Sequence, residues 1–124
     1  MADRVAVMPE VREILDEARA IIGDRAVREI SMFGAVALMV DDSMAVAVFR
    51  GESLLVRVRD DEDAALLAEP DAERSYMGER SMGLSWLRVA LDPEHSRLEF
   101  WVRAALRRPG KSARSASGGE PDGA

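Results

Sequence analysis

The sequence contains no cysteine and only one histidine among its 124 residues. Without cysteine there is no disulfide, no thiolate nucleophile and no sulfur-ligated metal, a composition typical of a reducing compartment. The longest apolar runs are about six residues, far below the roughly 20 that a membrane-spanning helix needs. The N-terminus also lacks the apolar core of a signal peptide. We therefore expect a soluble cytoplasmic protein that does not associate with membranes.

Basic residues are in the minority as well. The net charge is −6, from 17 Lys and Arg against 23 Asp and Glu, whereas tight binding to nucleic acid requires a basic patch. Direct nucleic-acid binding is therefore not expected. The length suits one domain with its own core, which we predict over residues 1–108. Residues 109–124 are mostly Gly, Ser, Ala and Pro and are predicted to form a disordered tail.

The centre of the chain, residues 27–58, alternates in hydrophobicity as β-strands do. Two polar segments, 41–43 and 50–53, interrupt it with Asp, Ser and Gly, which suit hairpin turns. Short connections of this kind join antiparallel neighbours. The stretch therefore predicts an antiparallel meander and, with the helices described next, an α+β fold.

Two amphipathic helices are predicted to flank the meander. The first covers residues 9–22, where an apolar stripe recurs at helical spacing between Pro9 and Gly23. The last begins at Asp92-Pro93-Glu94, after a strand over 84–91, and ends at Pro109. Between them we expect a short helix over about 61–68 that covers one sheet face, a strand over 74–77 and a turn over 78–81.

The first corner of the meander reads Met32-Phe33-Gly34-Ala35, and Met44 opens the strand after the Asp41-Asp42 turn. At the corner, glycine supplies room or a positive φ angle, which is a structural role. This order resembles the signature of the N-terminal domain of the TfoX/Sxy family of bacterial competence regulators. The strand 54–58, the segment 77–82 and the late aromatic residues Trp86 and Trp101 resemble the family too.

The resemblance covers roughly residues 9–108. It implies an antiparallel sheet flanked by helices, similar to the fold of secretion chaperones, and no activity that the residues explain. Full-length regulators of the family carry a further helical domain, where this chain has the tail 109–124.

Residues able to carry chemistry are few. His95 is expected on the surface in the first turn of the last helix, with no second ligand nearby. The acidic segments 41–42 and 60–63 lack the spacing of a calcium loop and suit a turn and a helix start. No serine has a Gly-x-Ser-x-Gly setting, and no phosphate-binding glycine loop is present. We therefore predict no enzyme, no metal site and no cofactor.

Binding is the remaining class of function. Arg57, Arg59 and Arg88 are predicted to share one sheet surface, either as a site for an acidic partner segment or as a solvated face paired with carboxylates. The leading hypothesis is a non-enzymatic regulatory module that binds a protein. The alternative is a small-molecule pocket between the sheet and the last helix, near Phe33, Trp86 and Trp101. A homodimer that covers a sheet edge is a further expectation.

Overall fold

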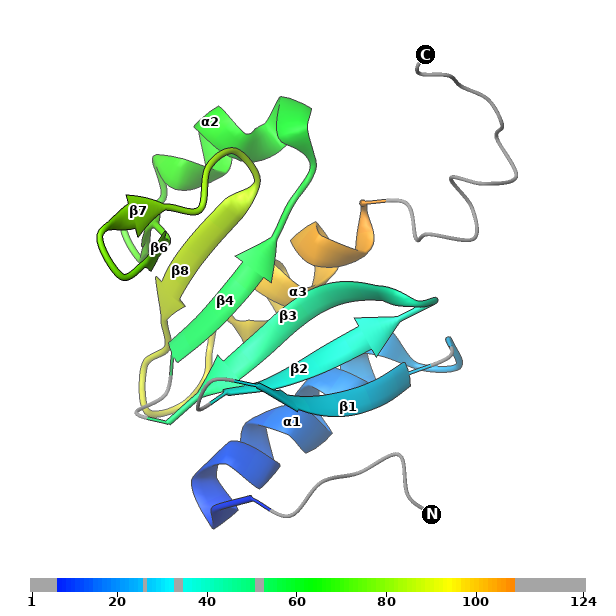
Figure 1. Cartoon of the computed structure of the whole chain (residues 1–124). Coiled ribbons are helices and arrows are strands. Elements are labelled where there is room, and N and C mark those ends of the chain that lie inside the picture. Colours follow the sequence, from blue (N-terminus) through cyan, green and yellow to red (C-terminus); the bar gives the residue numbers. More distant parts are fainter. Residues whose placement is uncertain (1–6, 26, 33–34, 51–52, 109–124) are drawn as a thin grey trace.

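The computed structural model describes residues 7–25, 27–32, 35–50 and 53–108 (Figure 1). Phe33, Gly34 and the predicted tail lie outside these residues. The elements in chain order are α1 (Pro9–Ile22), β1 (Val27–Met32), β2 (Ala35–Val40), β3 (Ser43–Phe49), β4 (Ser53–Arg57), the 3-10 turn η1 (Asp60–Glu62), α2 (Asp63–Leu67), β5 (Ala72–Arg74), β6 (Tyr76–Met77), β7 (Arg80–Ser81), β8 (Trp86–Ala90) and α3 (Leu98–Leu106). No helix in the described ranges is both long enough and apolar enough to cross a membrane.

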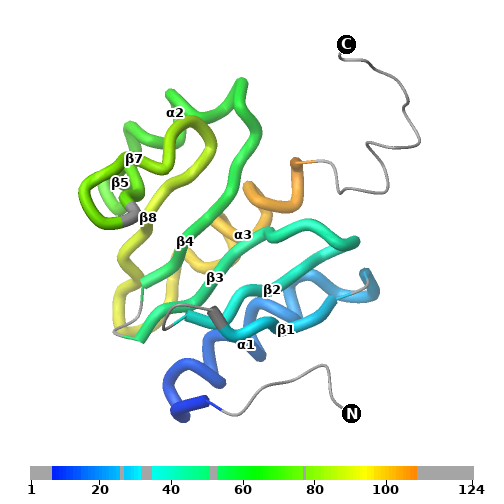
Figure 2. The backbone as a smooth tube through the Cα atoms, in the orientation of Figure 1, coloured from blue at the N-terminus to red at the C-terminus, as the bar shows by residue number. Residues whose placement is uncertain are grey.

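The main sheet has six strands in the order β1-β2-β3-β4-β8-β5, and each neighbouring pair is antiparallel. The first four strands follow one another along the chain, which confirms the predicted meander. The chain then runs through α2 to the edge strand β5 and forms the hairpin β6–β7. It returns as β8 between β4 and β5, so β8 lies beside β4 although residues 58–85 separate them (Figure 2).

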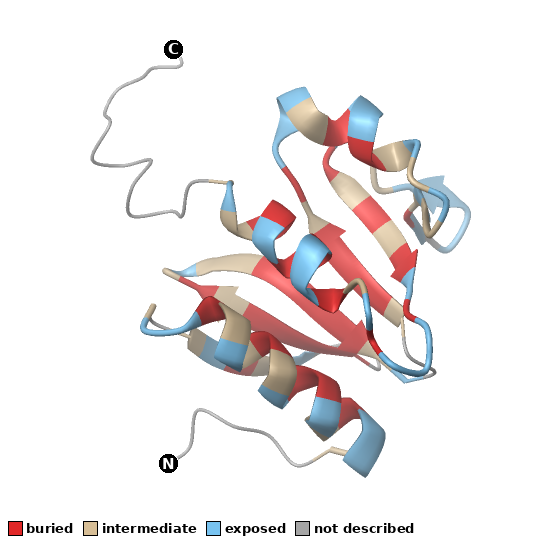
Figure 3. Ribbon diagram, turned by 180° about the vertical axis from the view of Figure 1, so that it is seen from behind, coloured by how far each residue is buried: buried red, intermediate tan, exposed pale blue. Residues whose placement is uncertain are grey.

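One face of the sheet is closed by α1 and α3, as Figure 3 shows from behind. Both helices turn their apolar stripe toward the strands, as their sequence periodicity predicts. Burying each large apolar side chain contributes about 1.5–3 kcal/mol, so this layer is the main source of stability. Its fully buried side chains include Ile14, Leu15, Leu38, Leu54, Leu87, Leu98 and Trp101.

The turn between β2 and β3 has positive φ at both central residues, Asp41 (52°) and Asp42 (67°). Two positive φ angles in a two-residue loop suit the right-handed twist of a hairpin, and aspartate tolerates them better than most residues. Arg25 fixes the turn, because its Nη2 lies 2.7 Å from a carboxylate oxygen of Asp41. The turn forms here without the glycine that such hairpins usually have.

The prediction that the short helix, α2, covers a sheet face is wrong. The helix has only five residues and packs against β5 and η1 at the end of the sheet, with Leu66 reaching the core. The predicted strand over 74–77 is also divided, because β5 ends at Arg74 and β6 pairs with β7 in a separate hairpin.

The last helix begins at Leu98 rather than at Asp92, which corrects the predicted start of that helix. The carboxylate of Asp92 accepts a hydrogen bond from the Ser96 N–H (2.9 Å), and the Asp92 carbonyl accepts one from the His95 N–H (2.9 Å). These bonds close a tight turn in place of a helical one. His95 has φ +56° there and is buried instead of lying on a helix surface.

Candidate functional site

The face of the sheet opposite α1 and α3 carries a second, smaller apolar cluster. Its floor is formed by alanines of β2 and β3, with Leu55 of β4 beside them. Larger side chains rise around this floor, among them Met39, Met44, Phe49, Met82 and Trp86. Because alanine has so little volume, the middle of this face lies lower than its rim.

The result is a hollow of about 550 Å³, which we call the open-face hollow. Its volume lies within the roughly 300–1,000 Å³ of ligand pockets. Most of its surface is apolar, and Ser75 and Arg88 bring polar or charged groups to it. The lining residues are Ala35, Met44, Ala47, Phe49, Leu55, Ser75, Tyr76, Met82, Trp86 and Arg88.

Two of the three predicted arginines lie on this face. In the register of β4 and β8, Arg57 lies opposite Trp86 and Leu55 lies opposite Arg88, so all four side chains point the same way. The Arg57 guanidinium lies over the Trp86 ring, 4.9 Å from its centroid, and that of Arg88 lies 4.2 Å from the Phe49 centroid. Such cation–π contacts hold flat guanidinium groups against apolar surface.

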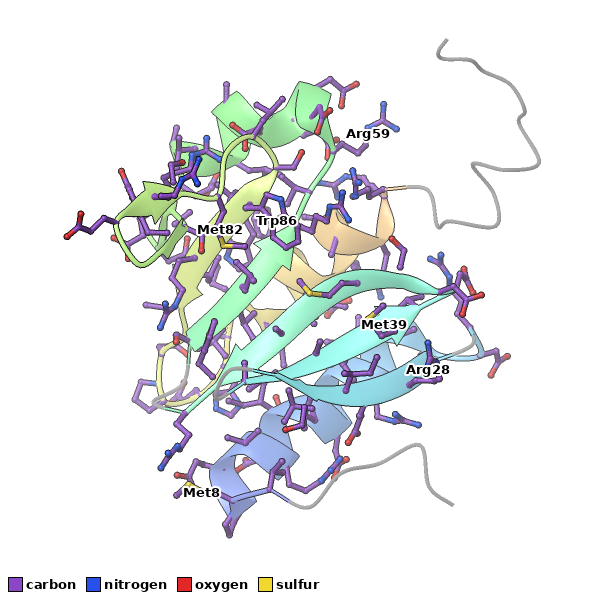
Figure 4. All side chains as sticks on the ribbon, in the orientation of Figure 1. Met8, Arg28, Met39, Arg59, Met82 and Trp86 are labelled. Carbon is purple, nitrogen blue, oxygen red and sulfur yellow. The ribbon has the colours of Figure 1, made fainter. Side chains whose placement is uncertain are left out.

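Arg59 is not part of this surface. It lies past the end of β4 and makes two hydrogen bonds to the Asp61 carboxylate, at 2.9 and 2.8 Å. These hydrogen bonds lower the pKa of Asp61. Figure 4 shows Trp86 and Met82 side by side, with Arg59 well away from them.

Trp101 lies on the other side of the sheet, so the predicted pocket between the sheet and the last helix is wrong. Its side chain is fully buried within the core, and its Nε1–H donates to Asp71 at 2.9 Å. Burial acts to raise the pKa of Asp71, but hydrogen bonds from Arg97 and Trp101 outweigh it and lower that pKa. The indole therefore ties α3 to the segment before β5 and contributes nothing to the open-face hollow.

The motif residues fall partly on the hollow. Met44 lines it, and Met32 is the last residue of β1, paired with Ala35. The two middle motif positions, 33 and 34, are outside the described residues.

One wall of the hollow is held by a buried ion pair that the sequence did not indicate. Asp63 is 3% exposed, and its two carboxylate oxygens accept bonds from Arg74 at 2.9 and 2.7 Å. Asp63 also accepts the Ser85 N–H at 2.7 Å, while Arg74 donates to the Gly83 carbonyl at 2.7 Å. The pair thus fixes the segment just before Trp86. Its hydrogen bonds, that from Arg74 first, lower the pKa of Asp63.

The segment on each side of the hairpin β6–β7 completes the wall. The Met82 N–H donates to the Ser75 carbonyl at 2.8 Å, and the Ser75 N–H donates to the Trp86 carbonyl at 3.2 Å. Phe49, Tyr76 and Met82 were not predicted as site residues. The sequence did contain a signal for the hollow itself, however, since alanines alternate with larger apolar residues along β2 and β3.

His95 also differs from its prediction, because it has acidic groups nearby. Its Nδ1 lies 3.2 Å from both carboxylate oxygens of Glu17, and a carboxylate oxygen of Glu13 belongs to the same cluster. This cluster lies on the α1 side of the molecule, away from the open-face hollow.

Comparison with known proteins places the chain in a family. The model of the TfoX N-terminal domain matches residues 23–108, which is more than half of the chain and runs from the end of α1 to the end of α3. No curated protein and no solved structure matches the chain, so the likeness to secretion chaperones stays a prediction. The matched family is not a known enzyme family. The chain belongs to the TfoX N-terminal domain family.

Proposed function

We propose that this domain is a non-enzymatic regulatory module that binds a segment of another protein in the open-face hollow. The observation that carries the proposal is a hollow of about 550 Å³ on a sheet whose other face is filled by helices. Aromatic residues, methionine and arginine are the types enriched where protein interfaces form. Trp86, Phe49, Met82 and Arg88 supply all three types on this face.

Charge indicates what the partner segment carries. In the described part of the chain, the contacts of Arg88 are with the Ser53 hydroxyl (3.1 and 3.3 Å) and the Phe49 ring, neither of which is an anion. A cation at an apolar surface is complemented by a carboxylate, and Arg–carboxylate bonds are among the stronger hydrogen bonds. The partner segment therefore has a large apolar side chain for the hollow and an acidic residue for Arg88.

A displayed library of random peptides tests this directly. Selection against the full chain is expected to enrich sequences that combine a large apolar residue with Asp or Glu. The substitution Arg88→Ser should weaken binding of the enriched peptides about tenfold, which is about 1.4 kcal/mol. Arg103→Ser is the matched control, since Arg103 lies exposed on α3 beside Glu99.

The proposal fails if no peptide is enriched. It also fails if enriched peptides bind the Arg88→Ser and Trp86→Ala variants as tightly as the unchanged chain. An acidic protein without cysteine fits a cytoplasmic regulator that does not contact nucleic acid itself. The cytoplasmic location and the absence of direct nucleic-acid binding are both part of the proposal.

The size of the hollow favours a second candidate, a small apolar ligand with one anionic group. The two tryptophans separate this candidate from the first. Trp86 lines the hollow and Trp101 is buried on the other face, so a small ligand in the hollow should quench Trp86 alone. A metabolite screen that finds quenching in the unchanged chain, but none in Trp86→Phe, would favour the small ligand.

A further inference from the structure

His95 and two glutamates come together from distant parts of the chain. Glu13 and Glu17 are one turn apart on α1, and His95 belongs to the turn that precedes α3. One ligand atom from each residue lies within 4.8 Å of the others. The imidazole Nδ1 faces the carboxylate of Glu17, at 3.2 Å from both oxygens.

The histidine is held in place before any ligand arrives. Its side chain is 5% exposed, whereas that of Glu17 is 42% exposed. Its backbone is fixed on both sides, because the His95 N–H donates to Asp92 (2.9 Å) and the His95 carbonyl accepts from Leu98 (3.1 Å). A ligand that binds Nδ1 therefore removes little conformational freedom from His95, which favours binding.

The glutamates are arranged less favourably without a cation. Two like charges four residues apart on a helix repel each other, and the basic member of this cluster is a histidine. Glu13 is exposed and Glu17 is half-buried, so both carboxylates have room to rotate toward a common centre. A bound divalent cation would remove the repulsion and use all three groups.

We propose that Glu13, Glu17 and His95 bind a divalent transition-metal cation, with Zn²⁺ as the reference ion. One imidazole nitrogen and two carboxylate oxygens form a ligand set that suits zinc and its neighbours, whereas calcium and magnesium prefer oxygen alone. Zinc bonds of about 2.0–2.2 Å place neighbouring ligand atoms roughly 3.3–3.6 Å apart in a tetrahedral site, close to the 3.2 Å that already separates His95 Nδ1 from the Glu17 oxygens. Water completes the coordination on the exposed side of the cluster.

Calorimetric titration of Zn²⁺ into the metal-free, untagged full chain at pH 7.5 tests the site. We expect one ion per chain. His95→Gln should abolish that binding, and Glu13→Gln and Glu17→Gln should each weaken it at least tenfold. Glu10→Gln is the matched control on the same helix, because Glu10 is exposed and outside the cluster, and it should leave the affinity unchanged.

Because His95 is the only histidine and the chain has no cysteine, its imidazole nitrogen resonances report on this site without any substitution. One equivalent of Zn²⁺ should shift the Nδ1 resonance of the unchanged chain. The proposal is overturned if the imidazole resonances do not move, or if a folded His95→Gln variant binds Zn²⁺ as the unchanged chain does. A heat of Zn²⁺ binding without any change in the imidazole resonances would mean that Zn²⁺ binds surface carboxylates only. That result would overturn the proposal too.

Discussion

At the residue scale, neighbouring aspartates in one acidic run have unequal roles. The run at 60–63 looks uniform in the sequence, where it predicts a helix start. In the fold, Asp61 lies exposed and pairs with Arg59, while Asp63 is buried against Arg74 and the Ser85 amide. A buried carboxylate must keep its hydrogen bonds, because losing one leaves another polar group without compensation.

We therefore expect Asp63→Asn to lower the free energy of unfolding by about 2–3 kcal/mol, since it removes a buried charge-assisted pair and leaves Arg74 uncompensated. Asp61→Asn is the control and should leave stability nearly unchanged, because solvent screens its exposed pair. Urea unfolding at pH 7, followed by circular dichroism, measures both. Equal effects of the two substitutions would contradict the structural role assigned to Asp63.

The same pair gives a pH dependence with a definite sign. Arg74 holds the pKa of folded Asp63 below the ordinary value of about 3.9. The unfolded chain therefore binds the proton more readily than the folded one, and the stabilisation is present above that ordinary value. It is lost as the pH falls through the lowered pKa. The stability difference between the unchanged chain and Asp63→Asn should accordingly narrow at pH 3, provided that both remain folded there.

At the element scale, the ends of the two long helices follow different rules. The start and end of α1 agree with Pro9 and Gly23, both of which act locally. The start of α3 does not follow the Asp-Pro-Glu pattern, because Asp92 uses its carboxylate to close a turn before the helix. An N-terminal signal in the sequence can thus be satisfied by a turn as well as by a helix.

Gly23 ends α1 with φ +77° and ψ −130°, a conformation that is essentially restricted to glycine. Gly23→Ala should lower the free energy of unfolding by about 1–3 kcal/mol. An added Cβ would meet no atom within 4 Å, so the whole cost is backbone strain. Ala20→Ser, at an exposed position in the last turn of α1, should change stability by less than about 0.5 kcal/mol. Chemical denaturation of both variants measures the two changes in the free energy of unfolding.

At the scale of the whole molecule, the two faces of one sheet are used differently. One face is packed by two helices, and the other keeps a hollow above a floor of alanines. Both faces look apolar in the sequence of β2 and β3, since the strands alternate between larger and smaller apolar residues. Within the part of the chain that the structure describes, the two long helices cover one face, because α1 and α3 lie on the same side (Figure 3).

The two tryptophans should report this difference. Trp101→Ala should cost about 3–5 kcal/mol, because it opens a cavity in the packed core and leaves Asp71 without one of its donors. Trp86→Ala should lower the free energy of unfolding by less than half as much, since the half-exposed ring already borders solvent. Denaturant midpoints of the two variants measure the comparison. A larger loss for Trp86→Ala would mean that the open face also carries the stability of the domain.

The sequence by itself determined the α+β class, an antiparallel meander of three or four strands, the helix over 9–22 and the family, because these depend on local periodicity, turn residues and the order of short motifs. Arg57 and Arg88 lie on one face of the sheet, but this depends on the register between β4 and β8, which the structure supplied. Only the tertiary structure decided which face the helices cover, where Trp101 packs and what His95 and Asp63 contact. Those features join residues that are far apart in the chain, and neither hydrophobic spacing nor turn chemistry carries information about such pairs.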